Sequence, residues 1–94
     1  MIKHVVCFKL KEGEDKKKAK DVLLSMIGNV PTAKGICVHI DELKSPRSFD
    51  IILEVILEDF KALDEYQVDP YHVGVVKKHM NAVAENSITL DFTL

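Results

Sequence analysis

Alternation of apolar and polar residues marks four segments of the chain as β-strands. In the first segment the alternation is mixed, because Val5 and Cys7 add apolar side chains to the face opposite Val6. A period of two residues is typical of a strand, whose side chains point alternately to opposite faces. The predicted strands are 2–10, 36–43, 49–58 and 87–94.

Between these strands apolar residues recur every three or four positions, which is the period of an amphipathic helix. Helices are expected at 16–29 and 60–68, with Asp15 and Asp59 as residues suited to cap their first turns. A third helix is expected after Asp69 and up to Asn86, because proline is favoured at the first helical position. Its expected buried stripe is Val73, Val76, Met80 and Val83, whereas Lys77, Lys78 and Asn81 should face water.

The order strand, helix, strand, strand, helix, helix, strand predicts one α+β domain over residues 1–94. It fits a ferredoxin-like sandwich, in which four antiparallel strands carry their helices on one face. The other face of such a sheet must be polar, hydrated or covered by a partner. The first and last strands are neighbours in this fold.

The orientation of the last strand decides what the open face carries. If Asp91 points toward the helices, four large apolar residues point to the open face: Ile88, Leu90, Phe92 and Leu94. Monomers rarely expose so large a patch, and a second copy of the chain would cover it, together with Val5, Cys7, Ile52 and Ile56. In the reverse register Leu90 and Phe92 pack under the helices and Asp91 is hydrated. The alternation fits both registers, since a slip of one residue exchanges the two faces.

Composition narrows the class of protein. Apolar residues make up 47% of the chain, charged residues 30%, and the formal net charge is −2, which is typical of a globular domain. The basic run at 16–20 follows three acids, so it is interpreted as a solvated helix face and not as a nucleic-acid site. No segment approaches the roughly 20 apolar residues of a membrane span, and a cytoplasmic protein is expected. Cys7 and Cys37 lie in apolar runs without CxxC spacing, which favours two buried, reduced thiols over a disulfide.

Four polar residues are candidates for chemistry if Asp91 points inward. His4 and Asp91 would then lie on neighbouring strands, with His72 at the start of the third helix and Tyr66 near the end of the helix before it. A carboxylate beside an imidazole favours a general base, and a tyrosine hydroxyl can donate to a substrate oxygen. The alternative is that these histidines are satisfied core groups and that the tyrosine only packs. His39 and His79 are interpreted as surface or structural residues, and no spacing of ligands indicates a metal.

Three segments, 1–10, 66–72 and 90–92, resemble the stress-responsive α/β-barrel (Dabb) family of the dimeric α+β barrel superfamily. The resemblance covers nearly the whole chain and implies a homodimer with Asp91 turned toward the helices. By similarity to a cofactor-independent plant polyketide cyclase of the family, His72 would be the general base and Asp91 its orienting carboxylate. Tyr66 would be the hydrogen-bonding tyrosine and His4 a pocket histidine. A further pocket histidine of that cyclase aligns with Ile51, which puts a shared substrate in doubt.

The sequence leaves three functions open. The chain is a cofactor-independent lyase or cyclase with His72 as base, a non-catalytic protein that binds a small apolar or aromatic ligand, or a structural dimer. In the last case His4, His72 and Asp91 form a buried polar clasp. Related barrels bind haem or act as monooxygenases, but no residue here identifies a haem ligand, and no cofactor is expected.

Overall fold

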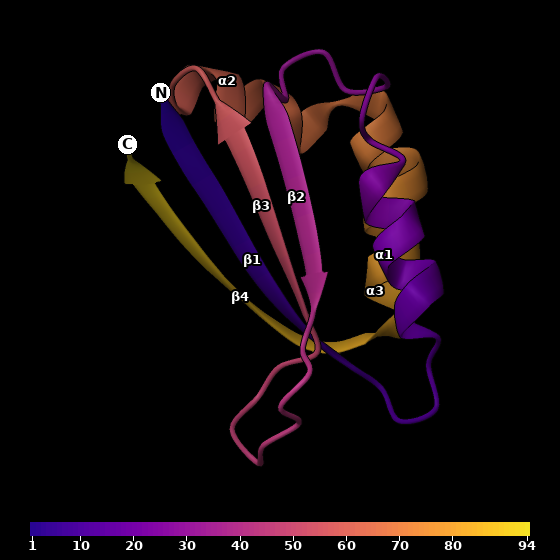
Figure 1. The fold of residues 1–94 in the computed structure, drawn as a ribbon. Helices are drawn as coiled ribbons and strands as arrows, with labels where there is room; N and C mark the ends of the chain where they lie inside the picture. Colours follow the sequence, from indigo (N-terminus) through magenta and orange to yellow (C-terminus); the bar gives the residue numbers. More distant parts are fainter.

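The computed structural model describes residues 1–94 and contains one sheet of four antiparallel strands (Figure 1). The strands lie in the order β2-β3-β1-β4, so the first and last strands of the chain are neighbours. This is the predicted ferredoxin-like arrangement. The strands are β1 (Ile2–Leu10), β2 (Gly35–Ile40), β3 (Ile51–Leu57) and β4 (Ala84–Thr93).

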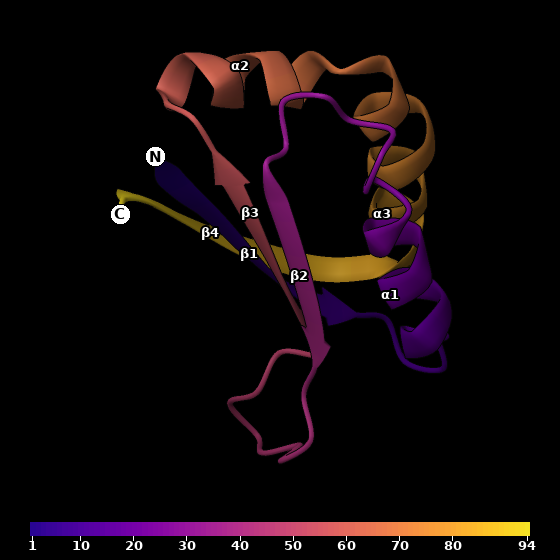
Figure 2. The same cartoon turned by 45° about the horizontal axis from the view of Figure 1, so that its top comes forward.

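Helices cover only one face of this sheet. In Figure 2 the helices α1 and α3 stand beside each other on one side, α2 crosses the upper end, and no helix lies on the other side. A π-helix, η1, runs directly into α3, so the two form one helical segment after Asp69. The helices are α1 (Lys16–Leu24), α2 (Phe60–Val68), η1 (His72–Lys77) and α3 (Lys78–Val83).

The helix starts agree with the sequence prediction, but one end does not. The Asp15 carboxylate accepts from the Lys18 N–H at 2.9 Å, and Asp59 accepts from the Ala62 N–H at 2.8 Å. The first helix ends at Leu24, five residues earlier than expected, because the Ser25 hydroxyl donates to the Val22 carbonyl and the backbone tightens into three-residue turns.

The third helix and the last strand also differ from expectation. The last strand begins at Ala84 and not at residue 87, because it pairs with β1 along the whole length of that strand. The helix before it is correspondingly shorter than predicted. On that helix Val76, Met80 and Val83 are buried as predicted, but Val73 is 44% exposed. The π-turn is the physical reason, since it breaks the three-to-four-residue spacing on which the predicted stripe rested.

The core lies between the helices and the inner face of the sheet. Alternate residues of β1 and β3 are buried there, among them Ile2, Val6, Leu53 and Val55. Both cysteines are free, but the prediction that both are buried is wrong for the single chain. Cys37 is exposed and Cys7 half-buried, because both strand positions face away from the helices.

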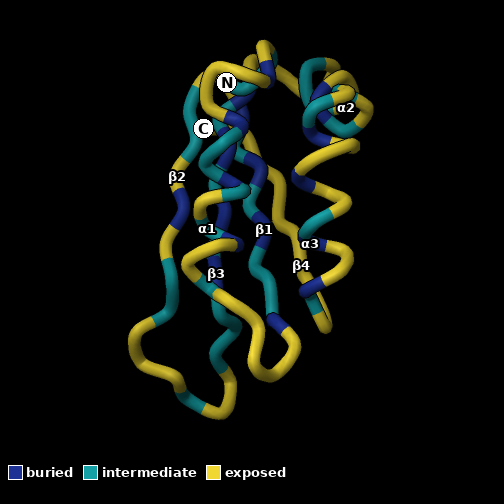
Figure 3. Tube along the Cα trace, turned by 90° about the vertical axis from the view of Figure 1, so that its right-hand side faces the viewer, coloured by how far each residue is buried: buried dark blue, intermediate teal, exposed yellow.

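The last strand has the register that turns Asp91 toward the helices. Asp91 is directly opposite His4, a buried residue of the inner face, whereas Leu90 is opposite Val5. Buried residues therefore follow β1 and β3, and β4 is exposed along most of its length (Figure 3). Ile88, Leu90, Phe92 and Leu94 are all exposed in the single chain, as the inward register of Asp91 predicts.

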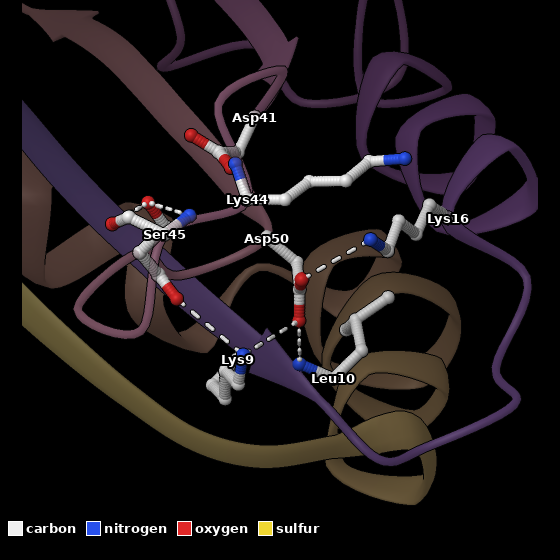
Figure 4. A network of polar contacts seen from close by, with 8 residues as sticks. Lys9, Leu10, Lys16, Asp41, Lys44, Ser45 and Asp50 are labelled. Atoms are coloured by element: carbon white, nitrogen blue, oxygen red, sulfur yellow. Dashed lines mark hydrogen bonds and ion pairs between the residues drawn. The ribbon is translucent and has the colours of Figure 1, made fainter.

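Asp50 ties together three parts of the lower end of the molecule (Figure 4). Its carboxylate accepts from the Leu10 N–H at 2.7 Å and lies 3.3 Å from Lys16 Nζ and 4.0 Å from Lys9 Nζ. Although burial alone raises the pKa of this carboxyl, the Leu10 N–H and the two ammonium groups outweigh it and lower the pKa below its ordinary value. The end of β1, the start of α1 and the residue before β3 are thereby fixed together.

Candidate ligand-binding and active site

The pairing of β1 with β4 brings His4 and Asp91 together. Because the two residues are direct cross-strand partners, their side chains lie on the same face of the sheet. His4 Nδ1 donates a hydrogen bond to Asp91 Oδ1, since an ionised carboxylate only accepts. The His4 residue is 4% exposed, and the Asp91 side chain is 29% exposed. The aspartate thus orients a buried imidazole and fixes its tautomer.

His72 is held at the start of η1 by the backbone that precedes it. Asp69 ends α2, and its carboxylate accepts from the N–H groups of Tyr71 at 2.9 Å and His72 at 3.1 Å. The Asp69 carbonyl also accepts from the Val73 N–H at 2.9 Å. Asp69 therefore caps the second helical segment and sets the direction in which the His72 side chain enters the fold.

The surroundings of His72 favour its neutral imidazole. Burial and then the positive charge of Lys77 lower its pKa, and the Gln67 backbone and the Asp69 carboxylate oppose this effect without reversing it. The residue is 8% exposed, and its buried Nδ1 atom has no hydrogen-bond partner in the chain. An unpaired buried nitrogen costs free energy.

Tyr66 lies between the two histidines. Its ring centroid is 4.3 Å from that of His72 and 5.7 Å from that of His4, and the residue is fully buried. Burial, and then the charge of Asp69, raise the pKa of Tyr66 well above its ordinary value, so the hydroxyl stays protonated. That hydroxyl donates to Met26 Sδ at 3.6 Å, which is a weak acceptor.

A cavity of about 160 Å³ adjoins these rings. The sheet contributes His4, Val6, Phe8, Leu53, Ser87 and Thr89 to its wall. The segment η1–α3 contributes His72, Val76, Lys77, Met80 and Asn81, and the earlier helices contribute Leu23, Tyr66 and Gln67. Cavities near this size hold a benzene-sized molecule. The space therefore suits a small ligand with an apolar part.

The structure brings the four predicted site residues into one cluster, but it pairs them differently from the resemblance. His4, Tyr66 and His72 line the cavity, and Asp91 reaches it only through His4. No hydrogen bond joins Asp91 to His72. The nearest acidic influence on His72 is Asp69, which the sequence analysis treated only as a helix boundary.

Several lining residues are not predicted by the sequence. Gln67, Ser87 and Thr89 carried no signal beyond their place at the ends of predicted elements. The helical period predicts Lys77 and Asn81 on the solvent-exposed face of an α-helix. Both residues are exposed, but both also line the cavity. A π-helix has no hydrophobic signature in the sequence, so their position could not be read from periodicity. No group of three or more His, Cys, Asp or Glu side chains is placed to hold a metal ion.

The stress responsive A/B barrel domain family, Dabb, matches the chain over residues 2–94, and the chain belongs to this family. No curated protein matches it. None of its helices has the length and apolar character needed to cross a membrane.

Solved structures share the fold at low identity. A dimeric protein of unknown function from Bacteroides fragilis is 19% identical, with 99% of this chain and 95% of that chain covered and a TM-score of 0.83. A dimeric ferredoxin-like protein of unknown function from Thermobifida fusca is 16% identical, with 99% and 90% covered and a TM-score of 0.85. The hydroxynitrile lyase of Passiflora edulis is also 16% identical, with 99% and 92% covered and a TM-score of 0.78. The fold is therefore one found in dimers and in at least one enzyme.

Proposed function

We propose that the chain forms a homodimer and binds a small, partly apolar or aromatic molecule in the cavity between η1 and β4, where His72 is the general base of a cofactor-independent lyase or cyclase reaction. The observation that carries this proposal is the His72 imidazole, which lines the cavity and is kept neutral by burial and Lys77. A neutral imidazole is ready to take a proton.

The cluster divides the work of such a reaction among its members. His72 removes a proton from the substrate, and the protonated Tyr66 hydroxyl donates to an oxygen that gains or loses charge. His4, oriented by Asp91, completes the wall beside Tyr66. In the cleavage of a cyanohydrin, His72 would take the hydroxyl proton while the bond to the cyano carbon breaks, so that the carbonyl forms as cyanide leaves with the electron pair of that bond. The protonated His72 would then return its proton to the cyanide, which leaves as hydrogen cyanide.

The likeness to a hydroxynitrile lyase supports this reaction class as the first to test. The test is cleavage of mandelonitrile, followed by the absorbance of benzaldehyde, in the wild-type chain and in His72→Gln. General-base catalysis contributes roughly 10²–10⁴-fold, so the variant should lose at least about a hundredfold. His79→Gln, on the same helical segment but not at the cavity, is the matched control and should keep the wild-type rate. An unchanged rate in His72→Gln would remove His72 as the base.

A non-catalytic ligand-binding protein and a structural dimer are the alternatives, and a second measurement separates them. A panel of small aromatic compounds, both neutral ones and carboxylates, is screened by thermal unfolding. A compound present at 100 times its dissociation constant should add about 2.7 kcal/mol of stability. Stabilisation without turnover of any cyanohydrin or polyketide would favour the binding protein. No stabilisation and no turnover would leave the structural dimer, with His4 and Asp91 as a clasp.

A further inference from the structure

Lys77 is the one Lys, Arg, Asp or Glu side chain among the fourteen residues that line the cavity. The residue is exposed, so its side chain contacts both solvent and the cavity wall. Lys3, Lys9, Lys16 and Lys17 form ion pairs with carboxylates, but Lys77 takes part in none. Its charge is therefore uncompensated within the chain and free to meet an anion.

The π-helix explains why this lysine reaches the cavity at all. His72 and Lys77 are the first and last residues of η1, and the hydrogen bonds of a π-helix join residues five apart. Residue i+5 therefore returns to nearly the same side as residue i. In an α-helix of 3.6 residues per turn, Lys77 would lie about 140° around the axis from His72. Asn81, one α-helical turn beyond Lys77, follows it onto the cavity wall.

Polarity is unevenly distributed over the cavity wall. Buried apolar side chains form its inner part, including Val6, Leu23, Leu53 and Val76. The exposed members of the wall are polar, namely Lys77, Asn81, Ser87 and Thr89. A ligand that satisfies both regions has an apolar body and a polar group at one end.

We propose that the ligand is a small organic carboxylate, bound with its apolar body against Tyr66 and His72 and its carboxylate at the mouth on Lys77. This inference rests on the cavity being the binding site. Lys77 supplies the positive charge and up to three donors, and the Asn81 amide and the hydroxyls of Ser87 and Thr89 supply further donors around the same opening. A single ammonium group suits a monoanion, and no carboxylate of the chain lines the wall to repel it.

The test compares phenylacetate with phenylacetamide, which differ in charge but hardly in shape. Both are titrated into the wild-type protein at pH 7.5 and low salt, and dissociation constants are measured by calorimetry or by amide chemical shifts. An exposed ion pair contributes up to about 1 kcal/mol, so phenylacetate should bind about fivefold more tightly than the amide. Salt at 0.5 M should remove most of this preference, because it screens exposed charges.

Variants of neighbouring lysines locate the effect. Lys77→Gln should bind the two probes equally, and Lys77→Arg should keep the preference for phenylacetate. Lys78→Gln is the control and should behave as wild type, because Lys78 is exposed and adjacent in sequence but does not line the cavity. Equal binding of the probes by the wild type, or a preference that survives Lys77→Gln, would overturn the inference. Binding of the amide but not of the acid would overturn it and leave the proposed cavity function standing. If neither probe binds, the inference fails, and the cyanohydrin assay tests the proposed function independently.

Discussion

The two buried imidazoles of the cluster, His4 and His72, have different hydrogen-bonding and electrostatic surroundings. His4 has a carboxylate partner in Asp91, across two strands that are locked in register. His72 has an unpaired Nδ1, a stacked tyrosine and a lysine one π-turn away. The first environment favours a fixed structural or orienting group, and the second favours a group that exchanges a proton or a hydrogen bond with a ligand.

Replacing Asp91 by Asn should destabilise the fold. The substitution removes a charged acceptor from a buried imidazole, and hydrogen bonds to charged groups contribute about 1.5–3 kcal/mol. Because the Asp91 side chain is partly hydrated, a loss of about 1–2 kcal/mol in the free energy of unfolding is expected, measured by urea denaturation. Glu85→Gln, an exposed carboxylate on the same strand, is the control and should change stability little. Equal stability of Asp91→Asn and wild type would show that the hydrogen bond contributes nothing to the fold.

The lowered pKa of His72 predicts a pH dependence of stability. In the unfolded chain a histidine titrates near pH 6.5, so between the folded pKa and about pH 6.5 the unfolded state binds more protons. Stability should therefore rise with pH through this window and level off above it. His72→Gln should flatten the rise in urea midpoints measured between pH 5 and pH 8, whereas replacement of the exposed His39 should not. An unchanged slope in His72→Gln would contradict the lowered pKa.

At the scale of elements, the junction between α2 and η1 decides the geometry of the site. Tyr66 lies in the last turn of α2 and His72 begins η1, and Asp69 both closes the first and caps the second. The π-turn that follows directs Lys77 and Asn81 to the cavity mouth. The sequence predicts the helix boundary at Asp69 and Pro70, but it predicts neither the Asp69 cap nor the π-turn, which depends on how the helix packs over the sheet.

Asp69→Ala should affect the site more than the fold. Loss of a helix cap typically costs about 1 kcal/mol. Asp15→Ala removes the equivalent cap of α1 and should cost a similar amount. Only Asp69→Ala should also weaken ligand binding at the cavity, because only that residue fixes the His72 backbone. The measurements are unfolding free energies and probe affinities of both variants. Equal affinities would show that Asp69 does not position the site.

At the scale of the whole molecule, one face of the sheet is left uncovered in a single chain. Leu90 is 66% exposed and is flanked by other apolar residues of β4, opposite the face covered by helices. The structural neighbours named as dimers share this fold. A second sheet packed across the open face would cover these side chains, and also Cys37, which faces away from the helices on β2.

Leu90→Glu should therefore dissociate the proposed dimer, because it places a charge where apolar side chains meet. The mass in solution, measured by light scattering or sedimentation, should fall to that of one chain, or the variant should lose its fold. Ile27→Glu makes the same exchange at an exposed position after α1, on the helix side, and should leave the mass unchanged. A Leu90→Glu variant that keeps the wild-type dimer mass would rule out this face as the interface.

The sequence by itself determined the elements, their order and two helix caps, because period and capping chemistry are local properties of the chain. It also supplied the four candidate residues His4, Tyr66, His72 and Asp91. Alternation fits both registers of β4, and although the family resemblance implies that Asp91 points inward, the pairing of β1 with β4 in the tertiary structure decided it. The tertiary structure alone assigned Asp91 to His4 instead of His72 and brought Lys77 to the cavity, because cross-strand register and a packed π-turn are set by contacts between distant residues.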